Sequence, residues 1–209
     1  MQAGLTLTEF DGRRFRANLE ACAAVYAAAM NPPPEQLPGR HSIMERHAGY
    51  AAFRAIAAIL RPGATGQAGA GAPLVVGFAY GFHGGRGQWW HDLVSRAVAG
   101  TLGRRAAADW FGDCLEIAEV HVRPGHQGRG TGLAMMLRLA AGRPERAAVL
   151  STLDADTRAR RLYRGLGFTD LLTDFAFPGT EPPYAIMGAP LPLPAAAAGL
   201  DRPPRPSRW

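Results

Sequence analysis

The sequence predicts an α+β fold in which a mixed β-sheet is flanked by helices. Short runs rich in β-branched and aromatic residues alternate with amphipathic helical patterns along the chain. A strand pattern, a glycine-rich turn and a helix pattern follow one another directly at 114–141. The 209 residues, 47% of them apolar, suffice for the core of one domain. We expect that domain to span 1–191, followed by a disordered tail rich in Pro, Ala and Arg at 192–209.

The first part of the chain is expected to be mainly helical. A short strand at 5–10 precedes a helix at Phe15–Met30, whose apolar residues recur at helical spacing. Asn31-Pro32-Pro33-Pro34 ends that helix, because proline has no amide hydrogen and disfavours helix in the residue before it. A shorter helix is expected at 41–48. Residues 51–60 fit a helix or a strand, and we predict a strand.

The middle of the chain has less regular patterns. The Gly- and Ala-rich residues 62–72 are expected to form a surface loop, and a glycine-bounded strand follows at 74–83. Residues 84–112 form an aromatic-rich insertion with a helical stretch at 91–99. Its large aromatic side chains either surround an amine or form a small core under a long loop; they are Trp89, Trp90, Trp110 and Phe111.

The second half is predicted to alternate strands with helices. Strands at 114–122 and 147–153 are each followed by a helix, the first at 132–141. Asp156 or Thr157 caps the second helix, which ends near Leu166 before Gly167. Two closing strands are expected, at 168–177 and 184–191.

The sequence contains no lysine, so all 23 Lys and Arg residues are arginine. This excludes Walker A phosphate loops, pyridoxal phosphate enzymes and Schiff-base aldolases, because each of them needs a lysine. The formal net charge of +6 favours an acidic partner, either nucleic acid or a phosphorylated cofactor. The sequence has no helix-turn-helix, zinc-finger or RNA-binding signature, so we expect no nucleic-acid partner.

Other features argue against a metal site, a membrane span and a secretion signal. Cys22 and Cys114 lack a CxxC partner, and the six histidines lack the spacing of a zinc site. No apolar run approaches the roughly 18 residues that span a bilayer. The N-terminus lacks the basic and apolar regions of a signal peptide. We expect buried, reduced thiols, no metal, no membrane partner and a cytoplasmic protein.

The main functional signal is the turn that joins the strand at 114–122 to the helix at 132–141. It reads Arg123-Pro124-Gly125-His126-Gln127-Gly128-Arg129-Gly130-Thr131-Gly132. The first amides of a helix have no partners within it and carry partial positive charge, and glycines let a ligand approach them. The pattern therefore predicts a pyrophosphate site. A plain glycine-rich turn is one alternative; a dinucleotide fingerprint is less favoured, because Leu133 replaces its third glycine.

This turn resembles motif A of the GCN5-related N-acetyltransferase (GNAT) family, Gln/Arg-x-x-Gly-x-Gly/Ala after a strand. Gln127, Gly130 and Gly132 fill the motif. Residues 156–168 resemble the second signature of the family, which ends in Leu-Tyr and then Leu-Gly-Phe. One helix and one strand separate the two signatures, as in the family, and the resemblance covers about 74–191. It implies a central, mostly antiparallel sheet that is splayed where acetyl-CoA binds.

The resemblance also implies acetyl-CoA as cosubstrate. Its pantetheine arm would run beside the end of the strand, and its pyrophosphate would lie on the amides of the turn. The implied cofactor-binding residues are Val120, His121, Val122, Arg123, Gln127, Gly128, Arg129, Gly130, Thr131, Gly132, Asp156 and Tyr163. The planar fork of arginine suits phosphate, although Arg123 and Arg129 are equally compatible with solvated surface charge. The family often has Asn at the position of Asp156, and that side chain usually contacts the pantetheine arm. Asp156 would therefore bring an added negative charge to the contact.

Direct acetyl transfer needs a base for the amine and an acid for the departing thiolate. Tyr163 occupies the position where the family commonly has its acid; core packing is its alternative role. Glu119 is the first candidate base, followed by Glu116 and then His121. The spacing of the two glutamates places them on opposite faces of the strand unless a β-bulge intervenes, as is common in the family. Burial would raise the pKa of either carboxyl group.

We expect the acceptor to be a primary amine of a small molecule, with a protein N-terminus as the second choice. The chain could instead bind acyl-CoA without efficient catalysis, as a sensor or accessory protein. The residues do not determine the acceptor, the acyl length or the oligomeric state, and a homodimer is one of the open options.

Overall fold

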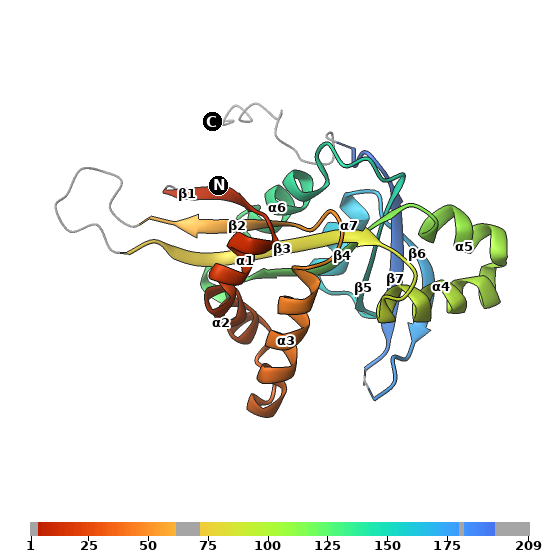
Figure 1. The fold of residues 1–209 in the computed structure, drawn as a ribbon, viewed down its shortest axis with the longest axis horizontal. Helices are drawn as coiled ribbons and strands as arrows, with labels where there is room; N and C mark the ends of the chain where they lie inside the picture. Colours follow the sequence, from red (N-terminus) through yellow and green to blue (C-terminus); the bar gives the residue numbers. More distant parts are fainter. Residues whose placement is uncertain (1–3, 62–71, 180–181, 195–209) are drawn as a thin grey trace, which may run out of the picture.

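The computed structural model describes residues 4–61, 72–179 and 182–194. They contain one seven-stranded sheet in the order β1-β2-β3-β4-β5-β7-β6 (Figure 1). Neighbouring strands are antiparallel except β4 and β5, which are parallel, so the predicted α+β fold with a mostly antiparallel sheet is confirmed. The strands are β1 (Leu5–Phe10), β2 (Arg54–Leu60), β3 (Leu74–Gly84), β4 (Cys114–Val122), β5 (Ala147–Leu153), β6 (Thr169–Phe175) and β7 (Tyr184–Pro190).

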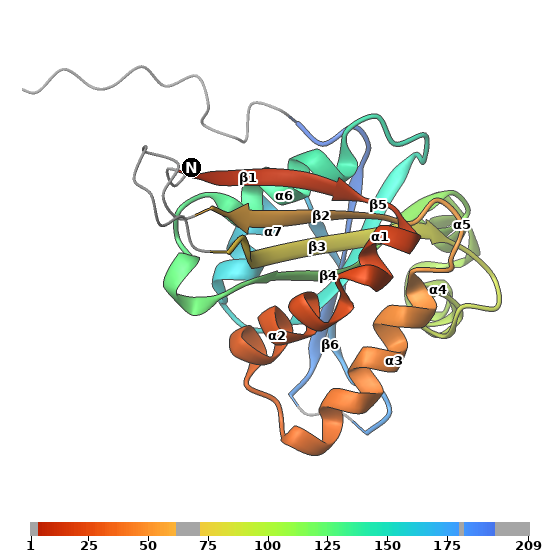
Figure 2. The ribbon, with the colours of Figure 1, turned by 60° about the vertical axis from the view of Figure 1, so that its left-hand side comes forward.

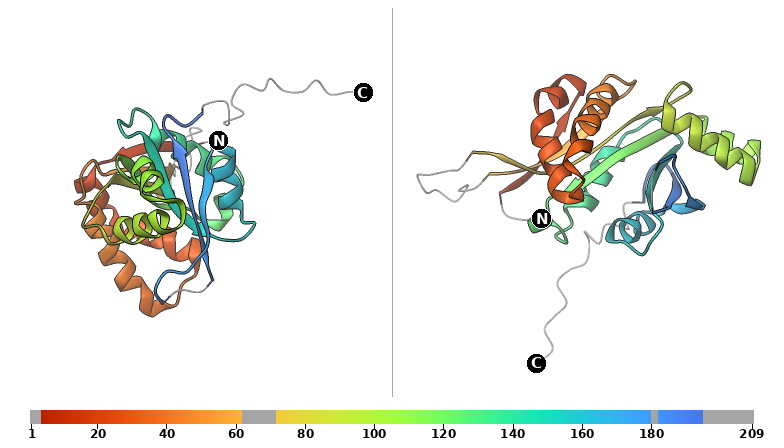
Figure 3. Two further views of the ribbon diagram at one scale, coloured as in Figure 1. Left: turned by 90° about the vertical axis from the view of Figure 1, so that its right-hand side faces the viewer. Right: turned by 90° about the horizontal axis from the view of Figure 1, so that it is seen from below.

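Helices cover both faces of the sheet (Figures 2 and 3). They are α1 (Gly12–Ala17), α2 (Leu19–Met30), α3 (Leu37–His47), α4 (Trp89–Leu102), α5 (Arg104–Phe111), α6 (Thr131–Ala140) and α7 (Arg158–Gly165), with the 3-10 turns η1 (Pro34–Gln36) and η2 (Pro124–His126). Helices α1–α3 pack on the face of β3 that carries Phe78 and Tyr80. Helices α6 and α7 pack on the opposite face, around Met135 and Leu166. Helices α4 and α5 form a third cluster with β5–β7.

The parallel pair β4 and β5 is hydrogen-bonded only at its beginning. Three residues of each strand are in register, and the last of these pairs is Glu116 with Val149. β4 continues to Val122 and β5 to Leu153 without further pairing between them. Since β3 pairs with the other edge of β4, the edge that faces β5 is open from Ile117 onward. This is the splay that the sequence resemblance implied.

A β-bulge at Ala118 changes which residues of β4 share a face. Glu119 pairs with Tyr80 on β3, and Glu116 pairs with Phe82, so β4 has one extra residue between the two pairs. Cross-strand partners lie on the same face, and so do Tyr80 and Phe82, which are two residues apart. Glu116 and Glu119 therefore share the face of the sheet that is covered by α1–α3.

Most predicted elements are present with small shifts in their bounds, and three strands, β1, β4 and β5, have the expected bounds. The helix predicted at 15–30 is instead two helices, broken at Asn18, whose φ of −118° and ψ of 16° are not helical. The Asn18 side chain donates to the carbonyl of Arg14 at 2.8 Å, which stabilises this break. Helix α5 was not predicted. The loop expected at 62–72 and the tail expected at 192–209 fall mostly outside the described residues.

Both cysteines are buried and free, as expected, and burial raises the pKa of each thiol to about 12. In the described parts of the chain, no helix has the length and apolarity needed to cross a membrane. The same residues contain no group of three or more His, Cys, Asp or Glu that could hold a metal ion.

Candidate active site

The glycine-rich turn leads from the open end of β4 into α6. Gly128 and Gly130 have positive φ values of 74° and 77°, which favour glycine. A Cβ added at either residue would meet no atom within 4 Å, so the turn is open on its outer side. Among the described residues, no carbonyl accepts a hydrogen bond from the amides of 128–133. These free amides lie at the positive end of the α6 dipole, as an anion site requires.

The side chains of the turn differ in their availability. Gln127 donates from Nε2 to the carbonyl of Val122 at 2.8 Å, which ties the turn to the end of β4. Arg123 donates from Nε to the carbonyl of Val75 at 3.2 Å, so its side chain is directed along β3. Arg129 is exposed and forms no ion pair with a described residue. Of the two arginines, Arg129 is therefore the more available for phosphate.

The start of α7 is capped by Thr157. Its Oγ1 accepts from the amide of Arg160 at 3.0 Å. Asp156 is exposed, and its carboxylate pairs with Arg161 at 2.7 Å. This pair offsets the additional negative charge that Asp156 brings to the implied pantetheine contact.

Tyr163 on α7 is 7% exposed and packs beside Phe168 in the core. Burial raises the pKa of its phenol well above the ordinary range, and the charge of Glu119 on β4 adds to this effect. The phenol and the Glu119 carboxylate are thus within electrostatic range of each other. The hydroxyl forms no hydrogen bond with a described residue.

Glu119 is 7% exposed, and both of its oxygens are engaged. Oε1 accepts from Nη1 of Arg40 on α3 at 2.9 Å, and Oε2 is hydrogen-bonded to Nε2 of His121. Burial alone would raise the pKa of Glu119, but His121 and Arg40 outweigh it and hold the pKa below the ordinary value. Glu119 is therefore ionised at neutral pH.

Glu116 is in the opposite state. It is 4% exposed, and its Oε2 has no partner among the described residues. Burial raises its pKa to about 8, so it is mostly protonated at neutral pH. Its pairing with Val149 places it at the point where β4 and β5 begin to separate.

Apart from His121, the sequence did not point to the groups that surround Glu119. The guanidinium of Arg40 lies over the ring of Tyr26 at 5.0 Å. Nδ1 of His47 is hydrogen-bonded to the hydroxyl of the fully buried Tyr80 at 3.0 Å, and burial lowers the pKa of His47 to about 4. These residues come from helices and strands far from the motifs, and none belongs to a sequence signature.

The aromatic insertion forms helices α4 and α5. Trp90, Trp110 and Phe111 pack in the cluster that joins these helices to β5–β7, so for them the small-core alternative holds. Trp90 also donates from Nε1 to Oγ of Ser151 at 3.3 Å. Trp89 is 63% exposed and lies against Phe177.

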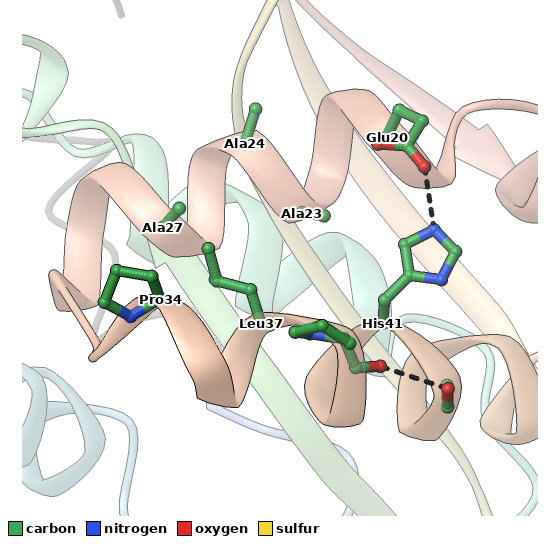
Figure 4. A pocket seen from close by; sticks show the side chains of 9 residues that line it. Glu20, Ala23, Ala24, Ala27, Pro34, Leu37 and His41 are labelled. Atoms are coloured by element: carbon green, nitrogen blue, oxygen red, sulfur yellow. Dashed lines mark hydrogen bonds and ion pairs between the residues drawn. The ribbon is translucent and has the colours of Figure 1, made fainter.

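A groove of about 600 Å³ lies between α2 and α3 (Figure 4). Ala23, Ala27 and Leu37 line it, and His41 pairs with Glu20 at one end at 3.0 Å. None of its lining residues belongs to the turn, β4 or α7. The groove is therefore separate from the candidate chemistry.

A splayed mixed sheet with an open glycine turn at the start of a helix defines the acetyltransferase fold. Residues 76–170 match the acetyltransferase (GNAT) domain family, in agreement with the resemblance carried by the two sequence motifs. It is 43% identical over 126 residues to a GCN5-like protein acetyltransferase of Mycobacterium tuberculosis. That alignment covers 58% of this chain and 61% of the relative, so the matched part spans about three-fifths of the relative's length.

Solved structures share the fold at low identity. A GNAT-family acetyltransferase from Bacillus cereus has a TM-score of 0.53 and 10% identity, covering 89% of this chain and 96% of that one. The spermidine/spermine N-acetyltransferase SpeG from Vibrio cholerae has a TM-score of 0.52 and 14% identity, covering 90% and 95%. The protein yncA from Salmonella typhimurium, solved with its cofactor acetyl-CoA, has a TM-score of 0.53 and 18% identity, covering 90% and 95%.

Proposed function

We propose that this chain transfers the acetyl group of acetyl-CoA to a primary amine in a ternary complex. The observation that carries the proposal is the set of free amides at 128–133, placed directly beyond the open edge of β4. A phosphorylated ligand with an extended, amide-containing arm fits both features at once. The matched family and the acetyl-CoA bound to the yncA protein support the choice of cosubstrate.

The residues present fit acetyl-CoA. Its pantetheine amides would bond to the open edge of β4 at Val120–Val122, much as an added strand would. Its pyrophosphate would lie on the amides from Gly128 to Gly132, with Arg129 supplying charge-assisted hydrogen bonds. The thioester then provides an activated acetyl group at the splay. We place Asp156 and Tyr163 on the α7 side of the same arm.

In the reaction, the amine nitrogen bonds to the acetyl carbon and the carbon–sulfur bond breaks. Tyr163 is protonated at any working pH because its pKa is raised, so it can donate a proton to the departing sulfur. The base belongs to the ionisable groups on β4, where Glu116 and Glu119 are the candidates from the sequence. Acid–base assistance of this kind contributes about 10²–10⁴-fold, and positioning of the amine contributes more.

Two classes of acceptor are candidates. A primary amine of a small molecule is the expectation from the sequence. An amine on a protein is the second candidate, because the mycobacterial relative with 43% identity is named a protein acetyltransferase. The similarity to SpeG, at 14% identity, supports the fold alone and does not favour a polyamine as the acceptor.

An acetylation assay tests the proposal. The purified chain is incubated with acetyl-CoA and, separately, with free lysine, spermidine, an aminoglycoside, a peptide with a free N-terminus and an N-blocked peptide with an internal lysine. We expect thiol release together with one acetylated product, detected by mass spectrometry. A product only with the peptides would replace the small-molecule acceptor by a protein amine. Neither thiol release nor product with any acceptor would contradict acetyl transfer and favour a binding role.

A further inference from the structure

Three ionisable side chains project from one face of β4 beside its open edge. They are Glu116, Glu119 and His121; the last two share a face because they are two residues apart. Arg40 and His121 engage both oxygens of Glu119 and hold its pKa below the ordinary value, so Glu119 is a weak base. Glu116 is buried at the closed end of the splay and holds its own proton at neutral pH. Neither carboxyl group is well suited to act as the base.

His121 has the geometry that the two carboxyl groups lack. Its Nε2 is hydrogen-bonded to Oε2 of Glu119, which favours the tautomer with the proton on Nε2. Nδ1 forms no hydrogen bond with a described residue, so it keeps a lone pair. The ring is fixed by two aromatic neighbours, Tyr26 edge-on at 5.2 Å and Phe78 at 5.5 Å. Its side chain is 11% exposed, enough to be reached by a small group or a water.

Arg40 completes this arrangement from α3. It binds the other oxygen of Glu119 at 2.9 Å, while its guanidinium lies over Tyr26. The positive charge of Arg40 beside one oxygen keeps the Glu119 carboxylate ionised. An ionised carboxylate accepts a hydrogen bond from the N–H of His121 more strongly than a protonated one does. The order Arg40, Glu119, His121 matches a catalytic base that is oriented by a carboxylate.

We propose that His121 is the general base of the reaction and that Glu119 and Arg40 position it. This inference rests on the proposed acetyl transfer. The proton that leaves the amine nitrogen as the nitrogen–carbon bond forms goes to Nδ1 of His121, directly or through one water. The thiolate released as the carbon–sulfur bond breaks takes its proton from Tyr163. Exchange with solvent then returns a proton to Tyr163 and removes one from His121.

The position of His121 agrees with this role. It is one of the three residues, Val120 to Val122, beside which the pantetheine arm is proposed to run. The titratable and charged groups around it are Glu119 on its own strand, Arg40 from α3 and Tyr26 from α2. The His47–Tyr80 pair lies behind Glu119.

Replacement of His121 by Gln tests the proposal. The Gln amide can still donate to Glu119 but has no nitrogen that accepts a proton. With the acceptor found in the acetylation assay, we expect kcat of His121→Gln to fall about 10²–10⁴-fold. The KM for acetyl-CoA stays unchanged, and the acidic limb of the pH–rate profile disappears. The matched control is His41→Gln, which changes a half-buried histidine of α3 paired with Glu20 and should leave kcat as in the wild type.

Positioning residues should behave differently from the base. Glu119→Gln and Arg40→Met should lower kcat and shift the acidic limb without removing it, because His121 is still present. Arg40→Lys keeps a positive charge near Glu119 and should recover part of the loss. A purely structural role for Arg40 would instead change the unfolding temperature and leave the pH profile in place.

A measurement without an acceptor makes the proposal independent of that assay. Nitrogen-15 NMR of the wild-type imidazoles should show that the neutral form of His121 carries its proton on Nε2, and Glu119→Gln should change that tautomer balance. A neutral ring with its proton on Nδ1 would overturn the proposal even if His121→Gln fails to fold. Full activity of His121→Gln would overturn it as well. Wild-type protein that acetylates no amine would contradict the proposed function instead.

Discussion

Glu116 and Glu119 lie on the same face of β4, three residues apart, in opposite states of ionisation. The bulge at Ala118 brings them to one face, opposite Phe82 and Tyr80 of β3. Glu119 has His121 and Arg40 as partners, and its pKa is lowered despite its burial. Glu116 has no such partner, and burial raises its pKa to about 8. The difference follows from what each carboxyl group touches, because the two are similarly buried.

Replacement of Glu116 by Gln should remove a pH dependence of stability. The unfolded chain releases the Glu116 proton near the ordinary value of 4.5, and the folded chain releases it near 8. Between these values the folded state binds more protons, so this group destabilises the fold as the pH rises. At about 1.4 kcal/mol per pKa unit, the wild type should lose roughly 3 kcal/mol relative to Glu116→Gln from pH 5 to pH 8.

Urea unfolding of both proteins at pH 5, 6.5 and 8 measures this difference. Parallel changes in the free energy of unfolding across the three pH values would show that Glu116 is not held protonated by the fold.

Replacement of Gly130 by Ala should weaken acetyl-CoA binding beyond its effect on stability. Gly130 has a φ of 77°, which costs an L-residue about 1 kcal/mol, and its new methyl group would project into the open space on the outer side of the turn. Gly87→Ala is the matched control, because Gly87 has a φ of 88°, has open space around it and lies outside the turn. Calorimetric titration with acetyl-CoA should show weaker binding for Gly130→Ala alone. Equal affinities for the two variants would argue against the turn as the phosphate site.

Replacement of Tyr163 by Phe should separate catalysis from binding. The hydroxyl has no partner among the described residues, so the free energy of unfolding should change by less than about 0.5 kcal/mol. Loss of the acid should lower kcat about 10²-fold or more while the affinity for acetyl-CoA is retained. Steady-state kinetics and calorimetry on the same preparation provide both quantities. An unchanged kcat would remove Tyr163 from the mechanism.

Arg160 should matter more for stability than its neighbour Arg164. Its buried guanidinium joins Asp154 to Asp170 and thereby ties α7 to β6 and to the residue that follows β5. Arg160→Met leaves both carboxylates without this partner and should lower the free energy of unfolding by about 2–3 kcal/mol. This is somewhat less than the loss expected when a fully buried ion pair is broken. Arg164→Met removes a half-exposed partner of Asp170 and should cost less than about 1 kcal/mol. Denaturant unfolding measures the free energy of unfolding of both variants. Equal losses would show that Arg160 contributes no more than Arg164 to the attachment of α7.

Local patterns in the sequence were sufficient for the elements that carry the motifs. β4, the glycine turn and α6 follow one another along the chain, so their order and spacing are visible in the sequence. The strand pattern ends at Val122, as the structure confirms, and α6 begins at Thr131, one residue before its predicted start. The bulge could only be stated as a condition, because register with β3 depends on residues about forty positions away.

Contacts between distant segments could not be predicted in this way. Arg40 and Glu119 are 79 residues apart, and Arg40 is one of 23 arginines with no pattern that singles it out. Helix α5 was missed because it has only eight residues, and the Gly103 before it provides no side-chain cap. Helix α1 was merged with α2 because the apolar spacing continues across Asn18, whose side chain ends the first helix.

Thermal unfolding with acetyl-CoA tests the central claim most directly, because it needs no knowledge of the acceptor. Free coenzyme A is measured beside it, and NAD⁺ is the control that carries a pyrophosphate without the pantetheine arm. A ligand at one hundred times its dissociation constant stabilises the folded state by about 2.7 kcal/mol. The account predicts a clear rise in Tm with acetyl-CoA and none with NAD⁺. No rise with either coenzyme A species at millimolar concentration would contradict the cofactor site at 127–132.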